Sequence, residues 1–208
     1  MGAGPLAGNS GEVGRSEADH GRGQAGTAAT CPADYAPAVV RPTHAREEQV
    51  NALVHVAYEF EMAWFCALRL ATERDTLSRF ESNAYLESCL IHVRSLYDFL
   101  CRNSTNADDI VRTDFAPPWA PTGEAAEATQ RLEAEAPAIN KYLAHLSWTR
   151  LNTSDQAPDA SRLWQPIDLF LDVARLLRAW ADHLAAEGPQ DLLPCALSLR
   201  DAATRALS

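Results

Sequence analysis

The chain has 208 residues, of which 47% are hydrophobic and 22% are charged, so it can form one folded domain with a sizeable core. Its formal net charge of −10 argues against broad DNA binding, because contacts to many phosphates need a concentration of Lys and Arg. A local basic pocket remains compatible with this charge.

Residues 1–43 are rich in Gly, Ala, Ser and Pro and show no hydrophobic period. This composition predicts a disordered tail in front of a single helical domain over residues 44–208. The first residues lack the basic start and apolar stretch of a secretory signal, and no run of about 18 apolar residues predicts a membrane span. We therefore expect a cytoplasmic protein that does not enter the membrane.

Two long amphipathic helices are predicted first. Apolar residues recur with helical spacing from Arg46 to Leu77, and again from Asn83 to Arg102, where Ser82 or Asn83 is the expected N-cap. A long loop over residues 103–121 follows, with three prolines. Loops of this length are often functional, and three apolar side chains are expected to attach this one to the core: Ile110, Phe115 and Trp119.

The second half of the chain predicts further helices. The pattern predicts either two helices, over residues 123–135 and 137–151, or one helix kinked at Pro137. After a loop over residues 152–165, a long helix begins at Pro166 and ends at Gly188, and a short, weakly packed helix covers about residues 194–206. The predicted fold is all-α: an antiparallel bundle of four or five helices.

The sequence gives no indication of a metal or cofactor site. Its five cysteines include no Cys-x-x-Cys pair, and the common zinc, di-iron and nucleotide-binding motifs are absent. Cys66, Cys89 and Cys101 lie within apolar helical patterns, where a thiol behaves as a small hydrophobic group. We therefore expect inert thiols, no disulfide framework, no bound metal and no cofactor.

Two groups of polar residues could carry chemistry. Lys141, the single lysine, shares a helical face with His145 and Trp148, a set that suits a phosphate and a base or a second subunit. The alternative is a solvated pair at positions i and i+4 beside a packed tryptophan. On the second helix, Arg94 and Asp98 should pair, either as a buried clamp between helices or as a positioned guanidinium beside a site.

The late helix reads Ile-Asn-Lys-Tyr-Leu-Ala-His-Leu, and with the helical bundle it resembles the HEPN domains over roughly residues 46–187. These are small all-α domains, often dimeric, that occur in toxin–antitoxin and phage-defence systems, and many are metal-independent ribonucleases. Their motif has an Arg that is separated by four to six residues from a following His. His145 matches the histidine, whereas Ala138, Ile139 and Asn140 stand where the Arg is expected.

The resemblance implies RNA cleavage through the ribose 2′-hydroxyl, with His145 as general base or acid. Lys141, Arg94 or Arg150 would supply the cation that stabilises the phosphoryl charge, and Asn140 would orient the substrate or the histidine. Asp98 and Trp148 complete the candidate binding residues. The resemblance also implies a dimer with the site at its interface.

The alternative is a non-catalytic helical module that dimerises or binds a protein partner through the loops at 103–121 and 152–165. A ribonuclease needs His145 and a basic side chain in one solvent-reachable cleft. A His145 packed away from solvent would favour the interaction module.

Overall fold

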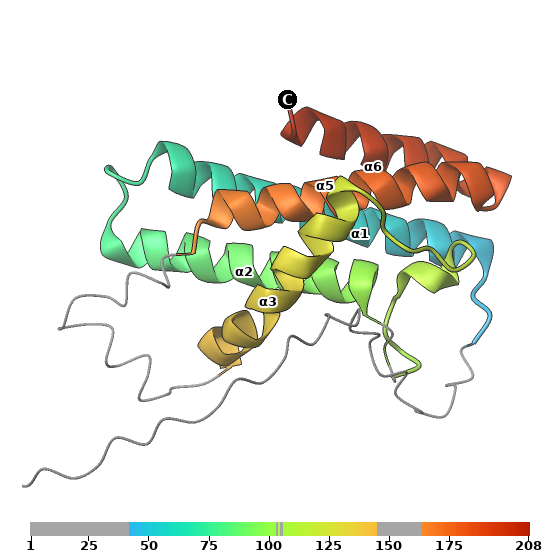
Figure 1. The fold of residues 1–208 in the computed structure, drawn as a ribbon, viewed down its shortest axis with the longest axis horizontal. Coiled ribbons are helices and arrows are strands. Elements are labelled where there is room, and N and C mark those ends of the chain that lie inside the picture. Colours follow the sequence, from blue (N-terminus) through green and yellow to red (C-terminus); the bar gives the residue numbers. More distant parts are fainter. Residues whose placement is uncertain (1–41, 103, 105, 145–163) are drawn as a thin grey trace, which may run out of the picture. The chain divides into compact units, whose positions relative to one another are not determined.

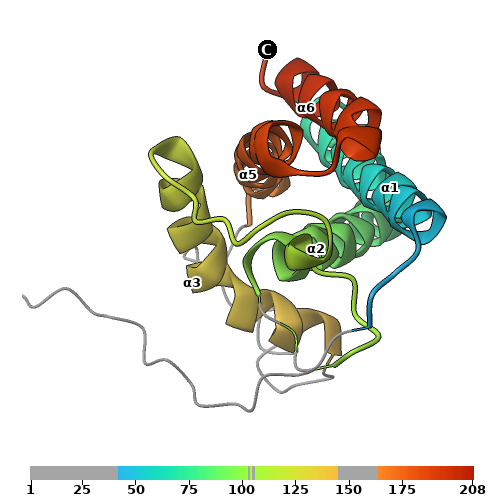
Figure 2. The same ribbon diagram turned by 90° about the vertical axis from the view of Figure 1, so that its right-hand side faces the viewer.

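The computed structural model describes residues 42–102, 104, 106–144 and 164–208. Helices account for all the regular secondary structure of these ranges, and strands do not occur in them, which confirms the all-α prediction. Residues 1–41 of the predicted tail and residues 152–163 of the predicted loop lie outside the described residues. Figures 1 and 2 show α1, α2, α5 and α6 running roughly along one direction, with α3 lying obliquely across them.

The first two helices form an antiparallel hairpin. Helix α1 covers Arg46–Thr72 and α2 covers Arg79–Cys101. The helical period is confirmed in both, since α1 buries Leu53, Phe60 and Ala67 toward the core. The predicted end of this helix at Leu77 is wrong. The helix ends at Thr72, and residues 73–77 form a turn.

Helix α2 begins earlier than predicted. Its N-cap is Ser78, whose hydroxyl oxygen accepts a hydrogen bond from the backbone N–H of Glu81 at 3.2 Å. The Glu81 carboxylate in turn accepts from the backbone N–H of Ser78 at 2.8 Å. This reciprocal capping box satisfies two N–H groups at the helix start, so Ser78 rather than Ser82 or Asn83 begins the helix.

The segment between α2 and α3 is anchored to the core through its second half. It contains the short 3₁₀ helix η1, Arg112–Asp114. Phe115 is buried, with its ring centroid 5.9 Å from that of Phe99 and 6.1 Å from that of Trp180. Trp119 packs partly against the core, as predicted. The prediction for Ile110 is wrong: its side chain is 44% exposed, and the neighbouring Val111 is buried instead.

Helix α3 covers Glu124–Ala144 as one helix with Pro137 inside it, so the alternative of a single helix is the correct one. It packs on α5 through a charged clamp. The buried carboxylate of Asp172 accepts hydrogen bonds from Arg131 Nε at 2.9 Å and Arg131 Nη2 at 2.8 Å. Arg175 Nη1 donates a further bond of 2.8 Å from within α5. The hydrogen bond to Asp172 raises the pKa of Arg131 above its ordinary value.

Helix α5, Pro166–Glu187, is the centre of the core and contacts each of the other α-helices in the described ranges. The predicted apolar stripe is confirmed, with Phe170, Leu177 and Trp180 fully buried. Gly188 ends the helix as predicted, although its φ of −81° is open to any residue. Its small size is required instead, because a Cβ there would lie 2.4 Å from the carbonyl oxygen of Leu184.

A short 3₁₀ helix η3, Gln190–Leu192, leads into α6, Leu193–Ala206. This last helix is not weakly packed. Ala196, Leu199 and Ala203 are buried, and α6 packs on α5 and α1. Their spacing of three and four residues places these side chains on one face of α6, which is the face toward the core.

Candidate functional site

The structure brings together three of the predicted site residues. Arg94 and Asp98 from α2 and Asn140 from α3 line one small hollow between these helices. We call it the α2–α3 hollow, and its walls are otherwise mainly apolar, formed by Val93, Tyr97, Leu132, Ala136 and Ile139. Arg94 and Asp98 also line an adjoining open depression of about 320 Å³. The hollow itself holds only about 10 Å³, roughly the space of one water, so the open depression is the part of this region that solvent reaches.

Arg94 and Asp98 pair as predicted, but they do not form a buried clamp between helices. Arg94 Nε lies 3.7 Å from Asp98 Oδ2, and the two side chains are 43% and 37% exposed. Arg102 Nη1 donates to the other oxygen of Asp98 at 3.2 Å. Because all three residues lie on α2, they tie no other helix to it. The second interpretation, a positioned guanidinium beside a hollow, is the one compatible with this geometry.

Asn140 offers an unsatisfied acceptor inside the hollow. Its side-chain oxygen Oδ1 is buried and has no hydrogen-bond partner among the described residues. A buried acceptor without a donor costs about 1–3 kcal/mol, so such an atom is usually completed by a ligand or water. Beside it, burial raises the pKa of Tyr97 above the ordinary tyrosine value, which keeps the phenol neutral at physiological pH.

Lys141 is exposed on α3 and does not line the hollow. The structure therefore leaves Arg94 as the cation that shares a hollow with Asn140. The remaining predicted residues, His145, Trp148 and Arg150, lie outside the described residues.

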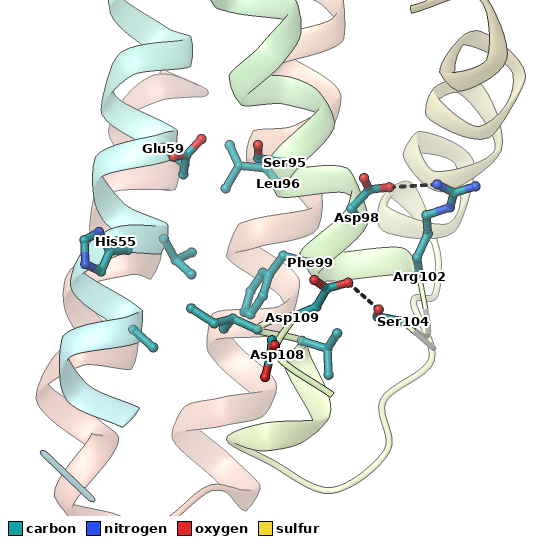
Figure 3. Close-up of a pocket in the computed structure, with 14 residues that line it drawn as sticks. His55, Glu59, Ser95, Leu96, Asp98, Phe99, Arg102, Ser104, Asp108 and Asp109 are labelled. Carbon is teal, nitrogen blue, oxygen red and sulfur yellow. Dashed lines mark hydrogen bonds and ion pairs between the residues drawn. The ribbon is translucent and has the colours of Figure 1, made fainter. Parts of the chain in front are cut away.

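A second and larger depression was not predicted. It is a groove of about 700 Å³ between α1, α2 and the segment at residues 104–111, shown in Figure 3. Four carboxylates line it, from Glu59 on α1, Asp98 on α2, and Asp108 and Asp109 on the loop. Arg102 and His55 are the basic side chains among its lining residues. We call it the acidic groove.

Several polar groups of the acidic groove are held by neighbours. Glu59 Oε2 lies 2.8 Å from His92 Nδ1, and this hydrogen bond links α1 to α2. His92 therefore has a hydrogen-bond partner within the fold. Ser104 donates a short hydrogen bond from its hydroxyl to Asp109, drawn as a dashed line in Figure 3. Asp98 marks the boundary between this groove and the α2–α3 hollow, because it lines both. The loop length at residues 103–121 was the sequence signal that could have found the groove.

The described thiols are reduced and buried to different extents. Burial raises the pKa of Cys89 to about 12 and that of Cys101 to about 11, so both stay protonated near neutral pH. No cluster of three His, Cys, Asp or Glu side chains suited to a metal ion occurs within the described residues.

Comparisons with protein-family models, with curated proteins and with solved structures find no match to the chain. Within the described ranges, no helix combines the length and the apolar character needed to cross a membrane.

Proposed function

We propose that this chain is a HEPN-like domain that binds RNA at the α2–α3 hollow and cleaves it without a metal ion, in a defence or toxin–antitoxin setting. One observation carries this proposal: Arg94 and Asn140 come from different helices and meet in the same hollow. His145 follows Asn140 by five residues in the sequence and supplies the general base or acid of the proposed reaction.

The two side chains suit two parts of a ribonucleotide. The Arg94 guanidinium is more than 40% exposed, and its planar N–H groups match the oxygens of a phosphate. The buried oxygen of Asn140 needs a donor, and the ribose 2′-hydroxyl is a donor that RNA has and DNA lacks. Because the hollow holds only about 10 Å³, this contact requires α2 and α3 to move apart when RNA binds. Together they favour RNA over DNA as the ligand.

The proposed cleavage uses only groups of the chain and of the RNA. His145 takes the proton of the 2′-hydroxyl, the 2′-oxygen attacks the adjacent phosphorus, and the bond from phosphorus to the 5′-oxygen breaks. His145 returns the proton that it took, directly or through water, to the leaving 5′-oxygen, and the product is a 2′,3′-cyclic phosphate. Arg94 stabilises the charge that builds on the phosphoryl oxygens.

The test is cleavage and binding of a mixed RNA pool in the presence of EDTA. We compare the wild type with His145→Ala, Arg94→Ala and Asn140→Ala, and use Arg200→Ala on α6 as the matched loss of an exposed arginine. Circular dichroism checks that all variants are folded. We expect cleavage to be lost in His145→Ala. RNA affinity should fall at least tenfold in Arg94→Ala, should also fall in Asn140→Ala, and should stay unchanged in Arg200→Ala.

Binding without cleavage by the wild type would keep the RNA site and reject the ribonuclease. Equal RNA binding by Arg94→Ala and Arg200→Ala would reject the site itself.

A second candidate function is a helical module that dimerises or binds a protein partner. It is favoured by four large apolar side chains on α1 that are 46–60% exposed: Val54, Tyr58, Phe65 and Leu68. Their spacing of four, seven and three residues places them on one face, as in helices that pack against another helix.

Sedimentation of the wild type and of Phe65→Glu tests whether this face forms a homodimer. A dimer that Phe65→Glu dissociates supports the module, and a monomeric wild type rejects the homodimer.

A further inference from the structure

The acidic groove combines a charged rim with an apolar wall, and its ligand differs from the one proposed for the α2–α3 hollow. We propose that it is a docking groove for a peptide segment of a partner protein that carries Arg or Lys beside a bulky apolar residue. This inference does not rest on RNA binding. Among the described residues, Asp98 is the single one that lines both the groove and the hollow.

The charge of the groove determines the sign of the ligand. Four carboxylates and one guanidinium, that of Arg102, line the groove, so its Asp, Glu and Arg side chains carry a net formal charge of −3. Asp98 is paired with Arg102 at 3.2 Å, and Glu59 with His92 at 2.8 Å. Asp108 has no ion-pair partner in the described part of the chain, and its residue is exposed. A negative concavity attracts a cationic group and repels the phosphates of RNA.

The apolar side of the groove indicates a peptide rather than a small amine. Val56, Leu96, Phe99 and Val111 form the buried base of the wall, and Ile110 is the large apolar side chain of the groove that is exposed, with 44% of its surface open to solvent. Val111 next to it is buried, so the loop is fixed while Ile110 stays at the opening. A volume of about 700 Å³ exceeds the space that one cationic side chain fills, which leaves room for an apolar neighbour.

The experiment selects random 12-residue peptides on phage against the immobilised full-length chain, and repeats the selection on Asp108→Lys and on Asp182→Lys. Both variants change the net charge equally, but Asp182 is exposed on α5 and does not line the groove. The most enriched peptide is then synthesised with a fluorescent label. Its affinity for each variant, and for Ile110→Ser, is measured by fluorescence anisotropy at low and high salt.

We expect the wild type and Asp182→Lys to enrich peptides in which Arg or Lys stands beside Leu, Ile, Phe or Trp. The synthesised peptide should bind Asp108→Lys at least tenfold more weakly and Ile110→Ser at least threefold more weakly. Enrichment of acidic or neutral peptides, or equal affinity for Asp108→Lys and Asp182→Lys, would overturn the proposal. RNA binding, measured in parallel, reports on the hollow and is expected to survive in Ile110→Ser.

Discussion

Two aspartates of this chain each lie between two arginines, and they differ in what surrounds them. Asp172 is 5% exposed, and it accepts both N–H groups of an arginine from another helix as well as one from its own. Asp98 is paired only along α2, and more than a third of its side chain is exposed. The same residue types therefore hold two helices together at one place and border two open depressions at the other.

This difference shows that the role of an ion pair depends on how deeply its side chains are buried and on whether they come from different helices. Exposed pairs at positions i and i+4 contribute a few tenths of a kcal/mol, because water already solvates both partners. A buried carboxylate depends on its partners, since few waters can replace them. We therefore assign Asp172 to the fold and propose a binding role for the surroundings of Asp98.

The largest effect is expected from Asp172→Ala. The substitution removes two charge-assisted hydrogen bonds that link α3 to α5 and a third within α5, and hydrogen bonds to charged groups contribute about 1.5–3 kcal/mol. We expect the free energy of unfolding to fall by about 2–3 kcal/mol, measured by urea denaturation. A change below about 0.5 kcal/mol would show that the clamp contributes no more than a surface pair.

The next effect concerns how α2, which carries Asp98, is stabilised. The capping box at Ser78 satisfies the start of this helix, so Ser78→Ala should lower the free energy of unfolding by about 1 kcal/mol. The same urea denaturation measures it, and Ser82→Ala is the control because Ser82 was the predicted cap. An equal loss in the control would mean that Ser78 is not the N-cap.

The capping box also makes a prediction about pH. Hydrogen bonds from Ser78 lower the pKa of Glu81 from its ordinary value of 4.5. A carboxyl with a lowered pKa in the folded state stabilises the fold above the unfolded pKa and loses that contribution as pH falls through the folded pKa. The stability difference between wild type and Ser78→Ala should therefore be full at pH 7 and shrink below about pH 4.5.

A smaller effect is expected from Asp98→Ala. Both of its arginine partners stay exposed to water after the substitution, so the free energy of unfolding should change by a few tenths of a kcal/mol. A loss that approaches that of Asp172→Ala would remove the contrast between the two aspartates.

The rate at which the thiols react tests the burial of Cys89 in the wild-type protein, with no substitution. Because burial raises the pKa of Cys89 to about 12, very little thiolate forms at pH 8, and a maleimide should modify it slowly. Cys195 is only partly buried and serves as the internal comparison. Mass spectrometry of the labelled peptides should show Cys195 reacting at least tenfold faster, and equal rates would contradict the buried position of Cys89.

Periodicity alone was sufficient to predict most of the helices. The apolar spacing of α1, α2 and α5 places the right faces in the core, and the pair Gly188-Pro189 marks the correct end of α5. The start of α2 was misplaced because several Ser and Asn residues compete as caps there. The capping box could have been recognised in the sequence, since Glu81 follows Ser78 by three residues.

The candidate site was only partly predictable. The Arg94–Asp98 pair is local, so its existence follows from helix geometry, but its exposure depends on which helices cover α2. Arg131 and Asp172 are 41 residues apart, and nothing in either local pattern joins them. The acidic groove depends on how the loop before α3 is anchored by Val111 and Phe115, which requires the packed core.

The most direct test of the two roles compares two matched substitutions, Arg94→Gln and Arg131→Gln. RNA affinity is measured by fluorescence anisotropy below the unfolding temperature, and the thermal midpoint is measured on the same samples. We expect Arg94→Gln to lose at least tenfold in RNA affinity with a midpoint within about 2 °C of the wild type, and Arg131→Gln to lower the midpoint while binding RNA normally. If Arg94→Gln binds RNA as the wild type does, or if affinity and midpoint fall together in both variants, the assignment of the α2–α3 hollow to RNA is wrong.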